Sequence, residues 1–453
     1  MSKNVSLKQS LAIIFTIVAS IVICVINEVS LFWGFLGSNV ILVSFLIKKG
    51  FSPKKIFQAS KYGILECSSL YFIILLMGSN IAIWMSSGII PTIIYYGFSY
   101  MQGANYILFS FLGTALISTV MGTGLGTLST IGIALLGIGK GFGLPPEIIL
   151  GAIVSGAFVS DKISPVSALT NLTIATVDTT YKEYFKTAIK TLAPMVLICS
   201  IIYFIIGSSY SVQLEDSLLL EYKHVLDSAY FISPWLMLLP VLVIGLAVSG
   251  INVLKNMSVI FVIGTSITLF VQNTPLYKVY ESVFWGYQAD TGHSFINSII
   301  KGGGVYPMIE VIGIVAGAII LNALLNLGEI LQPLINRFME NTKTKYSLIF
   351  KTGVISSVLT TLTCDQTVGI IVPGKMLKNN YEELGMDSTL LARTIADTGT
   401  IIAPLEFWNV NSLIIIGLTG IHTFAYAPFA FLCFISPIVT LCFAFAMPKT
   451  NKI

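Results

Sequence analysis

Long apolar runs separated by short polar segments recur along the whole chain. Runs such as residues 11–27 and 424–446 approach the roughly 20 residues that an α-helix needs to cross about 30 Å of hydrocarbon. The pattern predicts spanning helices near residues 11–27, 29–47, 64–85, 191–208, 233–249, 256–273 and 305–325, and one last helix. We therefore expect an all-α, polytopic membrane protein.

Four stretches rich in Gly, Pro, Thr and acidic residues interrupt this pattern. MGTGLGTLST (121–130), within residues 103–140, and LTCDQTVGIIVPG (362–374) each predict a re-entrant hairpin, whereas DKISPVSALTN (161–171) and DTGTIIAPLEFWN (397–409) predict crossings with broken helices. Inside hydrocarbon every backbone N–H and C=O group must be paired, so such breaks persist only where they are buried in protein or line a wet cavity. We expect about ten crossings, with the transport path at these breaks.

The same order of elements occurs twice. Residues 1–208 form a first half, residues 209–232 an acidic external connecting loop, and residues 233–453 a second half. Basic loops follow different elements in the two halves, as expected for halves inserted in opposite orientations. Asp161, Pro165 and Asn171 align with Asp397, Pro404 and Asn409 at separations of 236, 239 and 238 residues. The sequence thus predicts inverted structural repeats.

Composition agrees with a membrane solvent, because 55% of the residues are apolar, only 10% are charged, and the mean hydropathy is +0.87. The net charge of +4 comes from short basic loops, and the absence of a run of five Lys or Arg argues against a nucleic-acid partner. The basic loop containing Lys48, Lys49, Lys54 and Lys55 predicts that both termini are cytoplasmic. We expect a multi-pass protein in the inner membrane of a bacterial cell.

Motifs for chemical catalysis or ATP use are absent from the sequence. The run GIGKGFG (137–143) lacks the Lys-Ser/Thr ending of a phosphate-binding loop, and neither a metal-ligand cluster nor a nucleophile elbow occurs. We therefore expect no enzyme and no cofactor, but a secondary transporter that uses Na+ or H+ as coupling ion. A channel is the less favoured alternative, because paired breaks should occlude the path rather than leave it open.

Acidic residues at the breaks are the candidate ion ligands, because a charge inside the membrane costs roughly 2.5 to 3.5 kcal/mol and usually persists for binding. Asp161, Asp365, Asp397 and Glu406 lie in or beside the breaks. For Asp161, which precedes Lys162, and for Asp397 an exposed position at a helix end is the alternative interpretation.

Two further acids have simpler interpretations. Glu66 lies close to Lys61, which favours an interfacial position. Glu310 lies near a predicted helix start, where the helix dipole stabilises a carboxylate.

Proton transport must depend on carboxylates, because the three histidines, His224, His293 and His422, lie in predicted external loops or at membrane edges. Burial favours the protonated form of a carboxyl group, and a bound sodium ion favours the ionised form. Competition between Na+ and H+ for one carboxylate follows from these two effects.

At the breaks the chain resembles the NhaC-type sodium/proton antiporter family. The matching stretches are GTLSTIGIALLGIG (126–139), GAIVSGAFVSDKISPVSALTNL (151–172), DQTVGIIVPGKMLKNNYEELG (365–385) and RTIADTGTIIAPLEFWN (393–409). Members of this family exchange Na+ for H+ or malate for lactate, or move amino acids and related amines. The resemblance also implies inverted repeats, alternating access by an elevator-like movement, and a homodimer.

The resemblance assigns binding residues by position. The family's binding region corresponds to Thr123, Gly124, Gly126, Thr127, Asp161, Ser164, Pro165, Ser167, Thr170, Asn171, Asp365, Gln366, Asp397, Thr400, Pro404, Trp408 and Asn409. Within this set the implied sodium ligands are Asp161, Asn171, Asp365 and Asp397.

Three departures from the family pattern bear on the substrate. Leu125 replaces a usual Trp, Ala168 replaces an Asp, and Glu406 and Phe407 replace an Ile-Pro pair. One hypothesis is that Glu406 supplies the missing carboxylate, to a cation or to the ammonium of an organic substrate, in which case Glu406→Gln should abolish coupled transport. A pocket enlarged at Leu125 and lined by the rings of Phe407 and Trp408 would suit a solute larger than Na+. Exchange of Na+ and H+, and exchange of an amino acid, amine or small carboxylate, both remain open.

Overall fold

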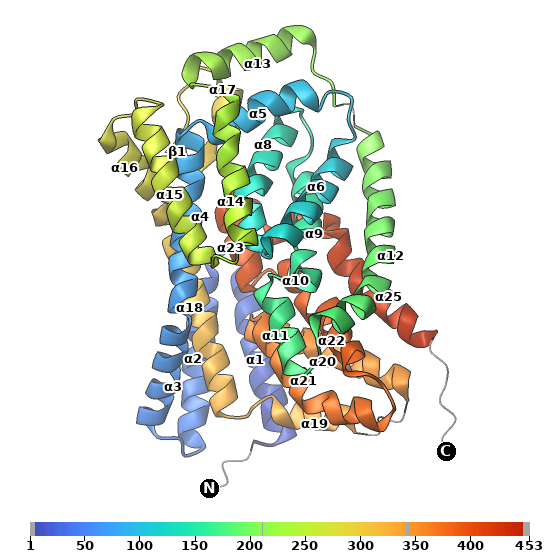
Figure 1. Cartoon of the computed structure of the whole chain (residues 1–453). Coiled ribbons are helices and arrows are strands. Elements are labelled where there is room, and N and C mark those ends of the chain that lie inside the picture. Colours follow the sequence, from blue (N-terminus) through green and yellow to red (C-terminus); the bar gives the residue numbers. More distant parts are fainter. Residues whose placement is uncertain (1–4, 211, 341, 343, 447–453) are drawn as a thin grey trace.

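The computed structural model describes residues 5–210, 212–340, 342 and 344–446, and these are almost entirely helical (Figure 1). Within these described residues, eight helices are long and apolar enough to cross a membrane, and the number rises to eleven if each sharply bent helix pair is one span. One short antiparallel pairing joins β1 (Tyr287–Gln288) to β2 (Lys301–Gly302). The prediction of an all-α membrane protein is confirmed, and the expected ten crossings lie within this range.

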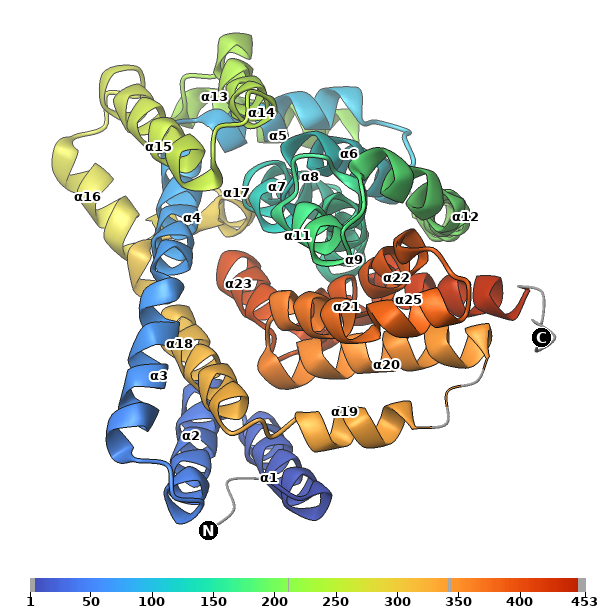
Figure 2. The same ribbon diagram turned by 60° about the horizontal axis from the view of Figure 1, so that its bottom comes forward.

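One side of the molecule is a wall of long helices, which Figure 2 shows curving around the other elements. The wall contains α1 (Leu7–Ile26), α2 (Leu31–Lys48), α3 (Pro53–Glu66), α4 (Ser68–Ser86), α15 (Val253–Phe270), α16 (Leu276–Trp285) and α18 (Val305–Leu327). Helix α18 packs on α2, α3 and α4, and α15 packs on α4. Asn39 of α2 donates to the carbonyl of Gly317 at 2.9 Å, which anchors α2 to α18 without a charge.

The first hairpin and the first broken crossing lie beside this wall. The hairpin comprises α6 (Tyr106–Met121), α7 (Gly124–Thr127), a π-helical turn at Leu128–Gly132 and α8 (Ile133–Gly141). The crossing comprises α9 (Pro146–Ala157), α10 (Ser160–Ile163) and α11 (Ala168–Thr176), and α12 (Tyr181–Ser208) follows. Both breaks therefore lie where the Gly- and Pro-rich sequence predicts them.

The second hairpin and crossing pack against the first pair, as α11 contacts α21 and α10 contacts the π-helical turn at Ala396–Thr400. The hairpin is α20 (Lys345–Thr363) with α21 (Gln366–Glu383). The crossing runs through α22 (Ser388–Ile395), a π-helical turn at Ala396–Thr400, a 3-10 turn at Ala403–Leu405 and α23 (Val410–Thr419). Helix α24 (Thr423–Tyr426), a 3-10 turn at Ala427–Phe429 and α25 (Phe431–Phe445) end the described chain.

The two hairpin tips have the same backbone conformation. Gly122 and Cys364 both end a helix in the left-handed region, at φ values of 72° and 58°. The next residues, Thr123 and Asp365, are extended N-caps of the returning helices. Each pair is separated by 242 residues along the chain. This common separation is an observation in favour of a structural repeat.

The N-cap residues of the broken crossings show the same separation. They pair different residues of the two halves from those that the sequence alignment paired. Ser167 caps α11 and Asn409 caps α23, again 242 residues apart, so Ser167 rather than Asn171 corresponds to Asn409. Asp161 lies in α10, whereas Asp397 lies in a π-helical turn further from its cap. The alignment of the two aspartates by sequence therefore does not give them equivalent places.

Several elements were not predicted from the apolar pattern. The connecting segment is not simply a loop, because it contains α13 (Asp216–Ala229), which bends by 85° into the next span through a 3-10 turn at Pro234–Met237 and α14 (Leu238–Val248). Shorter additional helices are α5 (Ile89–Tyr100), α17 (Ser294–Ile299) and α19 (Gln332–Met339). They are too short or too amphipathic to give the 20-residue apolar signal.

Candidate functional site

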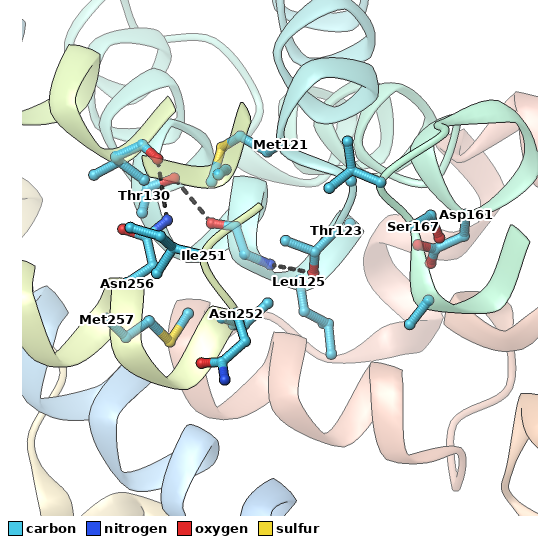
Figure 3. Close-up of a pocket in the computed structure, with 18 of the residues that line it drawn as sticks. Met121, Thr123, Leu125, Thr130, Asp161, Ser167, Ile251, Asn252, Asn256 and Met257 are labelled. Carbon is cyan, nitrogen blue, oxygen red and sulfur yellow. Dashed lines mark hydrogen bonds between the residues drawn. The ribbon is translucent and has the colours of Figure 1, made fainter. Parts of the chain in front are cut away.

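A cavity of about 490 Å³, the main cavity, lies where the interrupted segments meet (Figure 3). It is lined by the first hairpin tip, the α10–α11 break, the turn between α14 and α15, and the first residues of α21 and α23. Its polar and acidic lining side chains are Thr123, Thr130, Asp161, Ser167, Asn252, Asn256, Gln366 and Asn411. Three of the four predicted breaks contribute residues to this space, and the fourth, at 397–409, reaches it through the start of α23.

Six of the predicted site residues line this cavity, namely Thr123, Gly124, Gly126, Asp161, Ser167 and Gln366. The other members of the predicted set are not part of its lining. Thr127, for example, donates to the carbonyl of Thr123 at 2.9 Å and so stabilises the turn behind the cavity.

The first hairpin tip depends on glycine. Gly122 has a φ of 72°, and a Cβ there would lie 2.8 Å from the carbonyl carbon of Val166. A Cβ on Gly126 would lie 2.3 Å from the methyl group of Thr123. The hydroxyl group of Thr123 accepts from the Gly126 N–H at 3.2 Å. The tip can approach the α10–α11 break this closely because Gly122 carries no side chain, and the turn within the tip can close because Gly126 carries none.

Asp161 is the one acidic residue among the described residues that line the cavity. It is 8% exposed, and its carboxylate accepts a hydrogen bond of 3.3 Å from Ser160. Its second carboxylate oxygen lies close to Gly124, at 3.4 Å from the position that a Cβ on that glycine would occupy. Gly124 is the first residue of the helical segment Gly124–Gly141. The N-terminal dipole of that segment stabilises a carboxylate at this place. In the part of the chain that the structure describes, Asp161 forms no ion pair.

Polar residues after Asp161 stabilise the non-helical backbone of the break. Ser164 donates to the carbonyl of Thr119 at 2.6 Å, which joins the break to α6. Ser167 caps α11 by accepting from the N–H of Thr170, and the Thr170 hydroxyl donates to the carbonyl of Asp161 at 3.2 Å. These contacts pair backbone groups that the interrupted helix leaves unpaired.

Asn171 lies on the outer side of this loop. Its side-chain N–H group donates to the carbonyls of Pro165 and Ser167, both at 2.9 Å. Asn171 and Pro165 are exposed and do not line the cavity, whereas Ala168, where the family pattern has Asp, does line it.

Asp397 belongs to a separate, sealed cluster. Its carboxylate lies 2.5 Å from the Lys162 ammonium, accepts from the Thr440 hydroxyl at 2.5 Å, and lies 3.9 Å from Arg393. The side chains of Lys162 and Asp397 are 1% and 0% exposed, so burial argues against the alternative that Asp397 is a surface charge at a helix end. This ion pair joins the first broken crossing to the second.

Residues of the second hairpin and crossing form a connected hydrogen-bond network beside the cavity. Gln366 donates to the carbonyl of Thr400 at 2.5 Å and accepts from Asn411 at 3.0 Å. Asn411 also donates to the side-chain oxygen of Asn409, and Asn409 donates to Glu406, both at 3.0 Å. Glu406 thus lies outside the cavity lining, but two asparagines connect it to that lining.

The remaining predicted residues of the second half support this region. Asp365 caps α21 by accepting from the N–H of Thr367 at 2.8 Å. The carbonyl of Pro404 accepts from Tyr426 at 2.7 Å, and the indole N–H of Trp408 donates to the carbonyl of Thr361 at 2.8 Å.

A second cavity of about 760 Å³ lies between the α1–α2 turn, α18 and α23, and Phe407 lines it together with Glu28, Glu310 and His422. Glu310 is exposed and lies beyond the first turn of α18, where the dipole effect has faded. Glu66, the last residue of α3, is exposed as well. The ring of Phe407 thus faces a different cavity from Asp161.

The four implied sodium ligands do not meet in one place, because only Asp161 lines the main cavity. Among the described residues, no group of three or more His, Cys, Asp or Glu side chains is arranged to hold a metal ion. A cation in this cavity would instead meet Asp161 together with hydroxyl and amide oxygens, which are hard ligands suited to Na+.

Sequence reasoning missed Asn252, Asn256, Thr130 and Asn411 as lining residues. A usable signal existed for Asn252, which precedes a helix and caps α15 by accepting from the N–H of Lys255 at 2.9 Å. Asn411 had no such signal, because only the fold turns the start of α23 toward the cavity.

Four helices of nine or more residues begin at the cavity. Cap or first-turn residues of α11, α15, α21 and α23 line it, namely Ser167, Asn252, Gln366 and Asn411. Helix N-termini favour negative charge. The cavity therefore combines one carboxylate with several positive helix ends.

Comparison with known proteins gives consistent results. The model of the Na+/H+ antiporter family matches residues 156–446. The Na(+)/H(+) antiporter NhaC of Alkalihalophilus pseudofirmus is 30% identical over 83% of this chain and 81% of its own length. The malate-2H(+)/Na(+)-lactate antiporter of Bacillus subtilis is 25% identical over 86% and 84%, and the arginine/ornithine antiporter ArcD of Halobacterium salinarum is 25% identical over 92% and 86%.

Proposed function

Because the chain belongs to the Na+/H+ antiporter family, and is thus a multi-pass membrane transporter rather than an enzyme, we propose that it exchanges Na+ and H+ by alternating access. The observation that carries this proposal is the position of Asp161, a carboxylate that lines a cavity between interrupted segments of both halves. A buried carboxylate that is free of an ion pair can hold either a proton or a cation, and so couples the two.

Inverted repeats are part of this proposal. The hairpin tips and the crossing caps recur at one separation of 242 residues, which supports two structurally related halves around the cavity. Two related halves of opposite orientation allow the cavity to open to either side in turn. An elevator-like movement and a homodimer remain predictions from the family resemblance.

The proposed location is the inner membrane of a bacterial cell, with both termini in the cytoplasm. In Figure 1 the acidic helix α13 lies at the top of the molecule, and the connection between α2 and α3 lies at the bottom. The basic α2–α3 connection and the acidic connecting segment thus lie at opposite ends, as the positive-inside rule requires for this orientation.

The experiment is a Na+ pulse applied to proteoliposomes that hold an acidic interior. We expect Na+ to dissipate the pH gradient with saturable kinetics, and choline to have no effect. A gradient that is insensitive to Na+, Li+ and K+ would contradict the proposal. Conductance in a planar bilayer, or flux that does not saturate, would instead indicate a channel.

A second candidate is exchange of a small organic solute coupled to Na+ or H+. Two observations favour it: the cavity of about 490 Å³ is in the range of small-molecule sites, and four helix N-termini at its wall favour a carboxylate group. The names of two relatives include organic acids or amino acids. Uptake of labelled malate, lactate, arginine and ornithine, each with and without a pH or Na+ gradient, separates this candidate from simple cation exchange.

A further inference from the structure

Three side-chain amides form a chain whose orientation the backbone fixes at both ends. At one end the backbone N–H of Asn411, which can only donate, lies 3.0 Å from the side-chain oxygen of Asn409. At the other end the carbonyl of Thr400, which can only accept, receives the side-chain N–H of Gln366. The oxygen and nitrogen positions of these two amides are therefore set by their partners.

The orientation of Asn411 follows from its two neighbours. The side-chain oxygens of Asn409 and Gln366 both accept from the Asn411 side-chain nitrogen, at 3.0 Å each, and so use both of its hydrogens. Its carbonyl oxygen remains, and no described residue donates to it. Asn411 is 8% exposed and lines the main cavity. That oxygen has no donor in the described part of the chain and is not sealed from solvent, so it retains access to the cavity.

We propose that the side-chain carbonyl of Asn411 is a direct ligand of the transported cation, contributed by the second half to the cavity that holds Asp161. This assignment rests on the proposed function and names a contact for it. A carbonyl oxygen and a carboxylate both accept, so the ligand they share is a metal cation or a protonated amine. The carboxylate of an organic solute would take its place at the helix N-termini instead.

Glu406 has a positioning role in this arrangement. With its oxygen occupied by Asn411, the side-chain nitrogen of Asn409 needs an acceptor, and Glu406 provides it at 3.0 Å. The other carboxylate oxygen of Glu406 accepts from the Thr361 hydroxyl. Glu406 therefore anchors the end of the chain that lies away from the cavity, without contacting the cation itself.

Two substitutions at Glu406 separate positioning from direct contact. In Glu406→Gln the new amide oxygen accepts from Asn409 and the new N–H donates to Thr361, so the chain persists without the charge. In Glu406→Leu the nitrogen of Asn409 loses its acceptor and the chain can rearrange. A direct ligand role for the Glu406 charge predicts that both variants lose cation binding equally.

The experiment measures how Na+, Li+, K+ and ornithine shift the melting temperature of the purified full-length protein, with choline as reference. We expect Asn411→Leu to raise the apparent Kd of the stabilising cation about tenfold or more, as for loss of a hydrogen-bonding group to a charge. Glu406→Leu should resemble Asn411→Leu, and Glu406→Gln should stay within about twofold of the wild type. The matched control is Asn326→Leu, at an exposed position of α18 that is not part of the main cavity.

Unchanged cation affinity in Asn411→Leu would overturn the assignment, and so would a wild type that none of these cations stabilises. Loss of affinity in Glu406→Gln equal to that in Glu406→Leu would overturn the positioning role. Na+/H+ exchange is measured separately in proteoliposomes. Exchange in the wild type with unchanged affinity in Asn411→Leu leaves the proposed function intact, whereas Asn411-dependent binding without Na+/H+ exchange contradicts the proposed function alone.

Discussion

The surroundings of Asp161 and of Asp397 differ although both acids lie at broken crossings. Asp161 lines a cavity and forms no ion pair with any residue that the structure describes. Asp397 is fully buried between the Lys162 ammonium and Arg393 and lines none of the cavities described above. One carboxylate is available to a solute, and the other is already neutralised by protein cations.

This difference teaches that an intramembrane carboxylate is a candidate ion ligand only when no cationic side chain of the protein is paired with it. The cost of burying a charge is offset either by a protein partner or by a transported ion. At Asp397 the partner is Lys162, the neighbour of Asp161 in sequence. The pair therefore ties the two crossings together next to the cavity. Under the proposed function, Asp397 has a structural role and Asp161 a binding role.

The largest expected effect comes from removing the charge at Asp397. Asp397→Asn leaves two buried cations, Lys162 and Arg393, without a carboxylate, so we expect the folded state to lose about 3 to 5 kcal/mol. The measurement is the melting temperature of the purified protein in detergent, together with its yield from the membrane.

The matched control is Lys162→Met, which leaves Arg393 and Asp397 as a neutral pair. We expect a clearly smaller loss of stability than in Asp397→Asn. Equal losses in both variants would contradict the view that the carboxylate compensates two cations.

An intermediate effect is expected at Asp161, and it concerns transport rather than stability. Asp161→Asn keeps the shape of the side chain but removes the charge facing the cavity, so the apparent KM for Na+ should rise about tenfold to a hundredfold. The melting temperature without Na+ should not fall, because no protein cation loses its partner. Na+/H+ exchange in proteoliposomes and thermal melting are the two measurements. A variant that exchanges Na+ like the wild type would show that Asp161 is not the cation site.

The smallest effect is expected at an exposed pair outside the membrane spans. The Lys378 ammonium lies 2.7 Å from the carboxylate of Asp178, and this hydrogen bond holds the pKa of Asp178 below its usual range. A lowered pKa stabilises the folded state above the usual Asp pKa of about 3.9, and this contribution disappears as the pH falls through the lowered value.

Asp178 is exposed and Lys378 is half-buried, so solvent screens the pair, and its contribution should be small and should fall further in high salt. Melting temperatures of the wild type and Lys378→Met, compared at pH 7 and below pH 4, test this prediction. A difference as large as that for Asp397→Asn would contradict the distinction between buried and exposed acids.

Much of the architecture was predictable because hydrocarbon imposes simple rules. Apolar length predicted α1, α2, α12, α15 and α18, and the Gly- and Pro-rich runs predicted both hairpins and both broken crossings. Short or amphipathic elements such as α5, α13 and α19 escaped, because they need not cross the membrane and carry no long apolar run.

The candidate site was predictable only in part. Thr123, Gly124 and Asp161 line the cavity as expected, because local breaks expose them. Glu406 and Phe407 were expected beside the substrate, but Glu406 lies behind two asparagines and Phe407 faces the second cavity. Their neighbours come from residues that are remote in sequence, and no local pattern indicates which side of the crossing a side chain faces.

The sequence by itself determined a membrane-embedded helical protein with four interruptions in its apolar pattern, because the lack of water in lipid leaves few ways to satisfy a backbone. Only the tertiary structure decided which charges meet. It paired Lys162 with Asp397, left Asp161 at the cavity without an ion pair, and brought Asn411 to the wall of the same space. Such choices depend on distances between segments that are far apart along the chain, which residue spacing does not record.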